Sequence, residues 1–119
     1  MTDKKNIPFD FLFAYLPQSI RISPAFGMHG VYLEGRIVLM LNHRDKTPRL
    51  NGVWIAAYSK YHDNLIKEIP LAKPLKVNLT NTRSNWLFLP SSSADFEQST
   101  LLVCKLITKR DQRIGRMKF

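Results

Sequence analysis

The 119-residue chain has little of three things: cysteine, acidic charge and uninterrupted apolar sequence. Its one cysteine, Cys104, cannot form an intramolecular disulfide or a cysteine-based zinc site, which favours a reducing compartment. The apolar run 9–16 contains Asp10 and stops at Pro17, so it is too short to span a membrane and lacks the features of a cleaved signal. We therefore expect a cytoplasmic protein without a membrane segment.

Acidic residues are outnumbered two to one, with 9 Asp and Glu against 18 Lys and Arg. The resulting net charge of +9 and pI near 10.0 attract polyanions such as nucleic acid and acidic membrane surfaces, without selecting among them. The hydrophobic content of 45% is that of a globular protein and is sufficient for a packed core. Length and composition together predict one domain over residues 1–119.

Hydrophobic periodicity predicts a helix and then a hairpin-rich sheet in the first half of the chain. Apolar residues at helical spacing indicate a helix over 9–16. Strands are predicted at 19–23, 30–33 and 36–41, and the last of these is apolar enough to be central. Glu34-Gly35, between the second and third strands, predicts a tight hairpin turn.

The second half of the chain adds further strands and helices. Strands are predicted at 53–57, 75–79 and 86–89, with a helix over 59–68 and a final helix between Ser93 and Arg110. The order is therefore helix, three or four strands, helix, two strands, helix, without a regular strand–helix–strand repeat. This order predicts an α+β fold, in which a two-layer sandwich is formed by an antiparallel sheet with helices on one face.

Several short motifs follow one another along the chain. Before the apolar strand at 36–41 these are Phe26-Gly27, Gly30-Val31-Tyr32 and Gly35-Arg36. Later in the chain, Trp54 lies within 52–56 and Ile114-Gly115 within 111–115. In these motifs the chain resembles the TfoX N-terminal-domain-like family over roughly residues 20–116, with Ala25 in place of the family's usual methionine. The resemblance implies a two-layer α/β sandwich similar to type III secretion chaperones. It also implies that the motif residues are structural.

The function that this resemblance implies is that of a small binding or adaptor domain. Two-domain relatives regulate bacterial competence, with transcription as the output, and they carry a C-terminal domain that this sequence does not contain. A regulatory module with a protein partner, or a homodimer, is therefore expected. Gly27 and Gly35 are expected to adopt backbone conformations that penalise a side chain.

The sequence contains no motif for catalysis, metal binding or a cofactor. His29, His43 and His62 lack the spacing of a helical metal site, and no phosphate-binding glycine loop is present. Cys104 falls mid-helix on an apolar stripe, where a small core residue is expected rather than a nucleophile. These observations predict a protein that is not an enzyme and that has no metal, cofactor or small-molecule ligand.

Positive charge is concentrated in a basic tail, 109–119, whose five cations are Lys109, Arg110, Arg113, Arg116 and Lys118. One interpretation is a solvated end that also stabilises the helix C-terminus. A second is an arm that contacts nucleic-acid phosphates. A third applies to 113–116 alone, where Gly115 permits a turn that docks Ile114 on the core.

The tyrosines and tryptophans are spread over several elements: Tyr15, Tyr32, Tyr58, Tyr61, Trp54 and Trp86. Strand aromatics usually belong to the core, but two on one sheet face are also able to stack nucleobases. Two functional hypotheses follow: an adaptor with a protein partner, and nucleic-acid association through the basic tail. An enzyme of unknown type is a third and weaker alternative.

Overall fold

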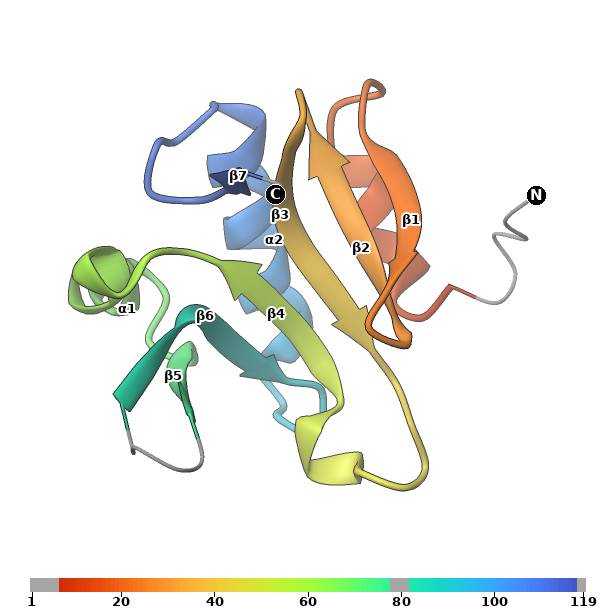
Figure 1. Ribbon diagram of the computed structural model, residues 1–119, viewed down its shortest axis with the longest axis vertical. Coiled ribbons are helices and arrows are strands. Elements are labelled where there is room, and N and C mark those ends of the chain that lie inside the picture. Colours follow the sequence, from red (N-terminus) through yellow and green to blue (C-terminus); the bar gives the residue numbers. More distant parts are fainter. Residues whose placement is uncertain (1–6, 78–81, 118–119) are drawn as a thin grey trace.

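A computed structural model describes residues 7–77 and 82–117 of the chain. One antiparallel sheet dominates it, with the strand order β1-β2-β3-β4-β6-β5 and a short β7 that pairs with β3 (Figure 1). The strands are β1 (Arg21–Ala25), β2 (Met28–Leu33), β3 (Arg36–Asn42), β4 (Gly52–Ala56), β5 (Lys73–Val77), β6 (Thr82–Pro90) and β7 (Arg116–Met117). The predicted α+β class is confirmed.

The helices are short, apart from the last one. They are η2 (Asp10–Tyr15), η3 (Pro48–Leu50), η4 (Ser59–Tyr61), α1 (His62–Glu68) and α2 (Phe96–Thr108). The first predicted helix is a 3-10 helix of 6 residues, because Phe9 before it has a left-handed φ of 57° and Pro17 follows closely. Within the described ranges, no helix is long and apolar enough to cross a bilayer.

All the longer helices pack on one face of the sheet, as predicted. In Figure 1, α2 lies behind the sheet. Leu12 of η2, Leu65 of α1 and Val103 of α2 are completely buried in a single core. The strands add the residues that alternate toward this side, Val31, Leu39, Leu41, Val53, Ile55, Leu87 and Leu89. No helix of the described residues lies over the opposite face of the sheet, and we call it the open face.

Strands that follow one another in the sequence are not always neighbours in the sheet. β4 pairs with β6, whereas β5 lies outside β6 at the edge of the sheet. The sequence of each strand accounts for its place. Leu87 and Leu89 suit an interior strand, whereas Lys73, Pro74 and Lys76 suit an edge. The predicted strand at 75–79 begins two residues earlier in the structure, and its end lies outside the described residues.

Two tight turns connect the first three strands. Glu34-Gly35 joins β2 to β3, as predicted, and Phe26-Gly27 joins β1 to β2. All four central residues have positive φ, namely 53° and 79° in the first turn and 54° and 76° in the second. Positive φ at both central positions is the type I′ geometry, which matches the twist of a hairpin. The expected conformations of Gly27 and Gly35 are thus confirmed.

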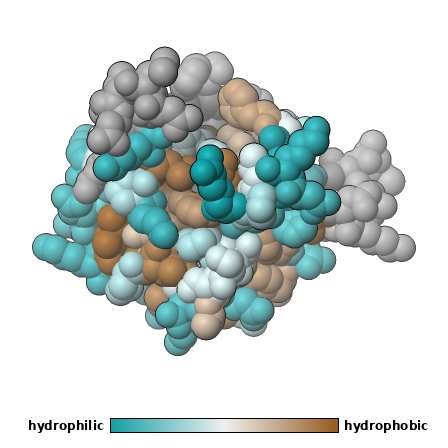
Figure 2. Space-filling model, turned by 90° about the horizontal axis from the view of Figure 1, so that it is seen from below, coloured by the Kyte–Doolittle hydropathy of each residue, from teal (hydrophilic) through white to brown (hydrophobic). Residues whose placement is uncertain are grey.

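The surface at one end of the molecule is mixed in character. Seen from below (Figure 2), apolar side chains are interspersed with hydrophilic ones rather than joined into one continuous field.

Candidate functional site

The open face of the sheet carries an aromatic groove. Its volume is about 570 Å³, and it is lined by Pro24, Ala25, Phe26, Met28, Tyr32, Ile37, Met40, Trp54, Trp86 and Arg116. These residues come from six strands, β1, β2, β3, β4, β6 and β7, and from the β1–β2 turn. The groove, so defined, contains both tryptophans of the chain.

Antiparallel register brings the two tryptophans together. Trp54 lies opposite Met40 on one side and Phe88 on the other, and Trp86 lies opposite Ala56, two pairs further along. The two indole rings pack edge to face, with centroids 6.2 Å apart and an interplanar angle of 68°. Trp54 Nε1 donates to the Leu50 carbonyl at 3.2 Å. The rings are half-buried and held in place by the sheet.

Tyr32 reaches the groove because Gly30 has no side chain. A Cβ on Gly30 would lie 2.9 Å from a Tyr32 ring carbon. The Tyr32 ring therefore lies over the strand position that Gly30 leaves empty. Both residues belong to the motif Gly30-Val31-Tyr32, so the spacing of this motif has a direct steric explanation, in accord with a structural role.

Arg116 is the cation of the groove. Its guanidinium lies over the ring of Trp86 at 5.5 Å and over the ring of Tyr58 at 5.8 Å. Among the residues that the structure describes, no carboxylate pairs with Arg116, and its Nε has no hydrogen-bond partner. A guanidinium held by aromatic rings and lacking a counter-ion is suited to bind an anion.

The strands around the groove carry only positive charge. In the seven strands as the structure describes them, there is no Asp or Glu. Two further cations share the open face by register: Arg21 lies opposite Tyr32, and Lys73 lies opposite Phe88. Both are exposed. The described carboxylates lie on helices and connections, so no residue of the described strands neutralises this face.

The predicted tail cations do not form one free arm. Arg110 pairs with Glu34 at 3.2 Å, and Arg113 pairs with Asp111 at 2.7 Å and also with Glu68. Arg116 lies in the groove, and Lys109 is exposed. Lys118 lies outside the described residues.

The segment around Ile114 is docked on the core. Ile114 is buried, and the Gly115 amide donates to the Ala56 carbonyl at 2.7 Å. Arg36 Nη2 donates to the Gly115 carbonyl, also at 2.7 Å. The interpretation that Ile114 docks on the core is therefore confirmed. Because Arg116 follows Ile114 and Gly115 directly, this contact also positions Arg116 in the groove.

An ion pair between Asp111 and Arg113 stabilises this segment, and its strength depends on pH. The Arg113 hydrogen bonds lower the pKa of Asp111, and Asp111 in turn raises the pKa of Arg113. Both side chains are about four-fifths buried, with 19% exposed in each. A carboxyl whose pKa is lower in the folded state stabilises the fold above its unfolded pKa of about 4 and loses this effect as pH falls.

We expect Asp111→Asn to lower the free energy of unfolding by about 1–2 kcal/mol at pH 7, because charge-assisted hydrogen bonds are lost. The difference from the unsubstituted protein should shrink as the pH falls below about 4, the unfolded pKa, because the lowered folded pKa of Asp111 then ceases to favour the folded state. Urea unfolding at pH 7 and at pH 3 measures both values. A deficit of equal size at the two pH values would contradict the assigned role of the ionised carboxyl.

No family model, curated protein or solved structure matches this chain. The groove and the charge around it are therefore the features of this chain that bear on its function.

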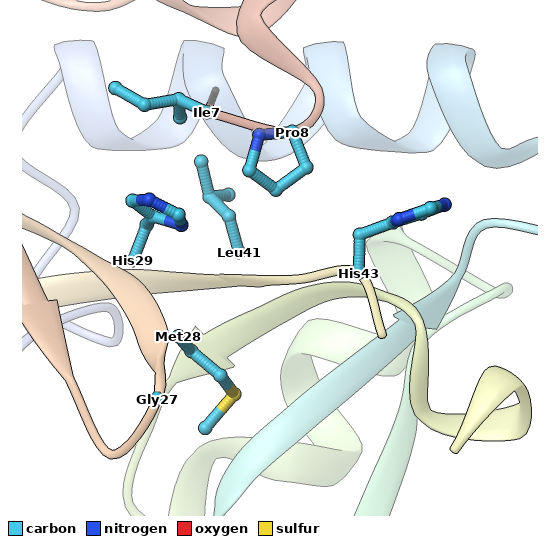
Figure 3. Close-up of a pocket in the computed structure, with 7 residues that line it drawn as sticks. All are labelled: Ile7, Pro8, Gly27, Met28, His29, Leu41 and His43. Atoms are coloured by element: carbon cyan, nitrogen blue, oxygen red, sulfur yellow. The ribbon is translucent and has the colours of Figure 1, made fainter. Parts of the chain in front are cut away.

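A second, smaller pocket lies where the N-terminal segment crosses the sheet. It has a volume of about 230 Å³ and includes Ile7, Pro8, His29 and His43 (Figure 3). The two imidazoles lie on either side of Leu41 in this view. Within residues 7–77 and 82–117, no three histidine, cysteine, aspartate or glutamate side chains are grouped as a metal site requires. This pocket supplies no evident chemistry.

The family-motif positions fall into two groups in the structure. Gly30, Tyr32, Arg36, Ile114 and Gly115 have the packing or hydrogen-bonding roles described above, whereas Phe26 is 85% exposed. Sequence reasoning considered aromatic stacking on a sheet face but did not identify which residues share one. A signal was available in the alternation of β4 and β6, where Trp54, Trp86 and Phe88 occupy the positions between core residues.

Proposed function

We propose that this chain is a small binding domain that associates with single-stranded nucleic acid through the groove. The observation that carries the proposal is the position of Arg116, a guanidinium with no carboxylate partner among residues 7–77 and 82–117, beside two tryptophans on a sheet whose described strands hold no carboxylate. Aromatic side chains stack unpaired bases, and cations beside them bind the phosphates. The net charge of +9 adds a general attraction for polyanions.

A single strand fits the groove better than a duplex does. Bases in a duplex are already stacked on each other, so their faces are unavailable to Trp54 or Trp86. The ligand chemistry that matches the groove is therefore a run of unpaired nucleotides with its phosphates directed to Arg116, Arg21 and Lys73.

A protein partner is the competing ligand for this surface. The apolar residues of the groove would accept a hydrophobic segment, and the resemblance to the TfoX N-terminal-domain-like family favours an adaptor or a homodimer in transcription regulation. Pairing through the sheet edges is disfavoured, because β1 carries Arg21 and Pro24 and β5 carries Lys73, Pro74 and Lys76. The excess of positive charge on the strands favours the polyanion.

Intrinsic tryptophan fluorescence gives a direct test, since both tryptophans line the groove. We expect a single-stranded oligonucleotide to quench this emission and a duplex of the same sequence to do so weakly. Three phosphate contacts, to Arg21, Lys73 and Arg116, predict that log K falls with log salt at a slope of about −2.1. Affinity should then decrease about 20-fold between about 50 and 200 mM salt.

Arg116→Gln should reduce the magnitude of this slope by about 0.7, because one phosphate contact is lost. Lys105→Gln makes the same change of charge at an exposed position of α2, on the far side of the sheet, and serves as the matched control. Equal effects of the two substitutions would show that binding follows net charge alone. No quenching by any single strand at low salt would reject the proposed function. In that case, light scattering over a range of concentrations would test the homodimer.

A further inference from the structure

Phe26 is the most exposed large apolar residue of the described chain. It occupies the first central position of the β1–β2 turn, and 85% of its surface is accessible. It also lines the groove, beside Ala25 and Met28. Its ring is therefore at the rim of the groove and has little protein packed against it.

The backbone at Phe26 is unfavourable for this residue type. Its φ of 54° is left-handed, a region that bulky side chains rarely adopt. The first central position of a type I′ turn is normally Asn, Asp or Gly, and Asn-Gly is the preferred pair. Gly27, with a φ of 76°, already fits the second position.

Other contacts hold the turn in this shape. Arg44 Nη2 donates to the Phe26 carbonyl at 2.8 Å. Asn51 fixes Arg44 in turn, because its Oδ1 accepts from the Arg44 amide at 2.7 Å and its Nδ2 donates to the Arg44 carbonyl at 3.1 Å. These bonds involve only the backbone of Phe26, so they would hold any residue at this position equally well.

The backbone conformation of Phe26 thus reduces stability, and its exposed ring gains little burial on folding to offset this cost. We infer that Phe26 is a ligand-contacting residue, which stacks an unpaired base at the rim of the groove. This inference rests on the proposed function. Residues that oppose local structural preference commonly do so because they serve a site.

Phe26→Asn tests the inference, because it should stabilise the fold and at the same time weaken oligonucleotide binding. Asn suits the type I′ position, so the melting temperature should rise by roughly 2–5 °C. Loss of one stacked base should weaken binding of a single-stranded oligonucleotide by about 5- to 100-fold. Phe26→Tyr keeps an aromatic ring and should retain affinity within about 3-fold.

Glu34→Asn is the matched control, since Glu34 occupies the same position of the other type I′ turn, outside the groove. It should not weaken oligonucleotide binding, because loss of the Glu34 carboxylate and of its ion pair with Arg110 makes the net charge more positive. A lower melting temperature for Phe26→Asn would assign Phe26 a structural role and overturn the inference. If the wild-type protein binds and Phe26→Asn binds equally well, the inference fails while the proposed function stands. If the wild-type protein binds no oligonucleotide, both fail.

Discussion

Replacement of Gly52 by alanine is expected to lower the free energy of unfolding by more than about 2 kcal/mol. Gly52 is buried at the start of β4, with a φ of 151°, a conformation that residues with a side chain rarely adopt. A Cβ built there collides with the carbonyl oxygen of Leu89 and lies 3.0 Å from the Ser91 amide nitrogen. Both atoms belong to the backbone, so no rotamer change relieves the contact.

The surroundings of Gly52 explain why the backbones approach so closely. Gly52 lies opposite Pro90 at the end of β6, and the Ser91 amide donates to the Asn51 carbonyl at 2.9 Å. This contact joins the first residues of β4 to the last residues of β6. A side chain at position 52 would force the two strands apart where interior pairing begins.

Gly35→Ala is the matched control for backbone conformation without a steric contact. Gly35 has a φ of 79°, and a Cβ built on it meets nothing within 4 Å. Its replacement should therefore cost about 1 kcal/mol, from the left-handed conformation alone. Urea unfolding of both variants measures the difference. A Gly52→Ala variant as stable as Gly35→Ala would show that the β4–β6 junction adjusts more easily than its backbone contacts imply.

The thiol of Cys104 is expected to react with a disulfide reagent at least about 1,000-fold more slowly in the folded protein than in the unfolded chain. Cys104 has no exposed surface, and burial raises its pKa from 9.0 to about 12. Only the thiolate attacks a disulfide, and each unit of pKa reduces its fraction about tenfold at pH 8. Restricted access of the reagent slows the reaction further.

Release of the coloured thiolate from an aromatic disulfide reagent at pH 8 measures this rate, with and without denaturant. The signal reports a single site, because the chain has no other cysteine. Gly52→Ala should react faster than Gly35→Ala, since a less stable fold opens more often. Rapid reaction of the folded protein would contradict the burial of Cys104 behind η2, where its Sγ lies 3.9 Å from the Leu12 carbonyl oxygen.

Local patterns in the sequence were enough to predict most elements and their buried faces. The apolar run in 36–41, the turn at Glu34-Gly35 and the apolar stripe that carries Cys104 all appear in the structure as predicted. These features depend on residues that are close in sequence, and their periods of 2 and 3.6 are set by backbone geometry. The docking of Ile114 was also foreseen as one of several alternatives, because Gly115 follows it.

The tertiary structure alone decided which distant residues meet. β5 lies outside β6, Arg113 reaches Glu68, and Arg116 lies between Tyr58 and Trp86. Each of these pairings depends on the balance of packing over the whole chain, which periodicity does not encode. The sequence by itself thus determined an α+β domain with strong positive charge, whereas the gathering of its aromatics and Arg116 into one groove depended on strand order and register.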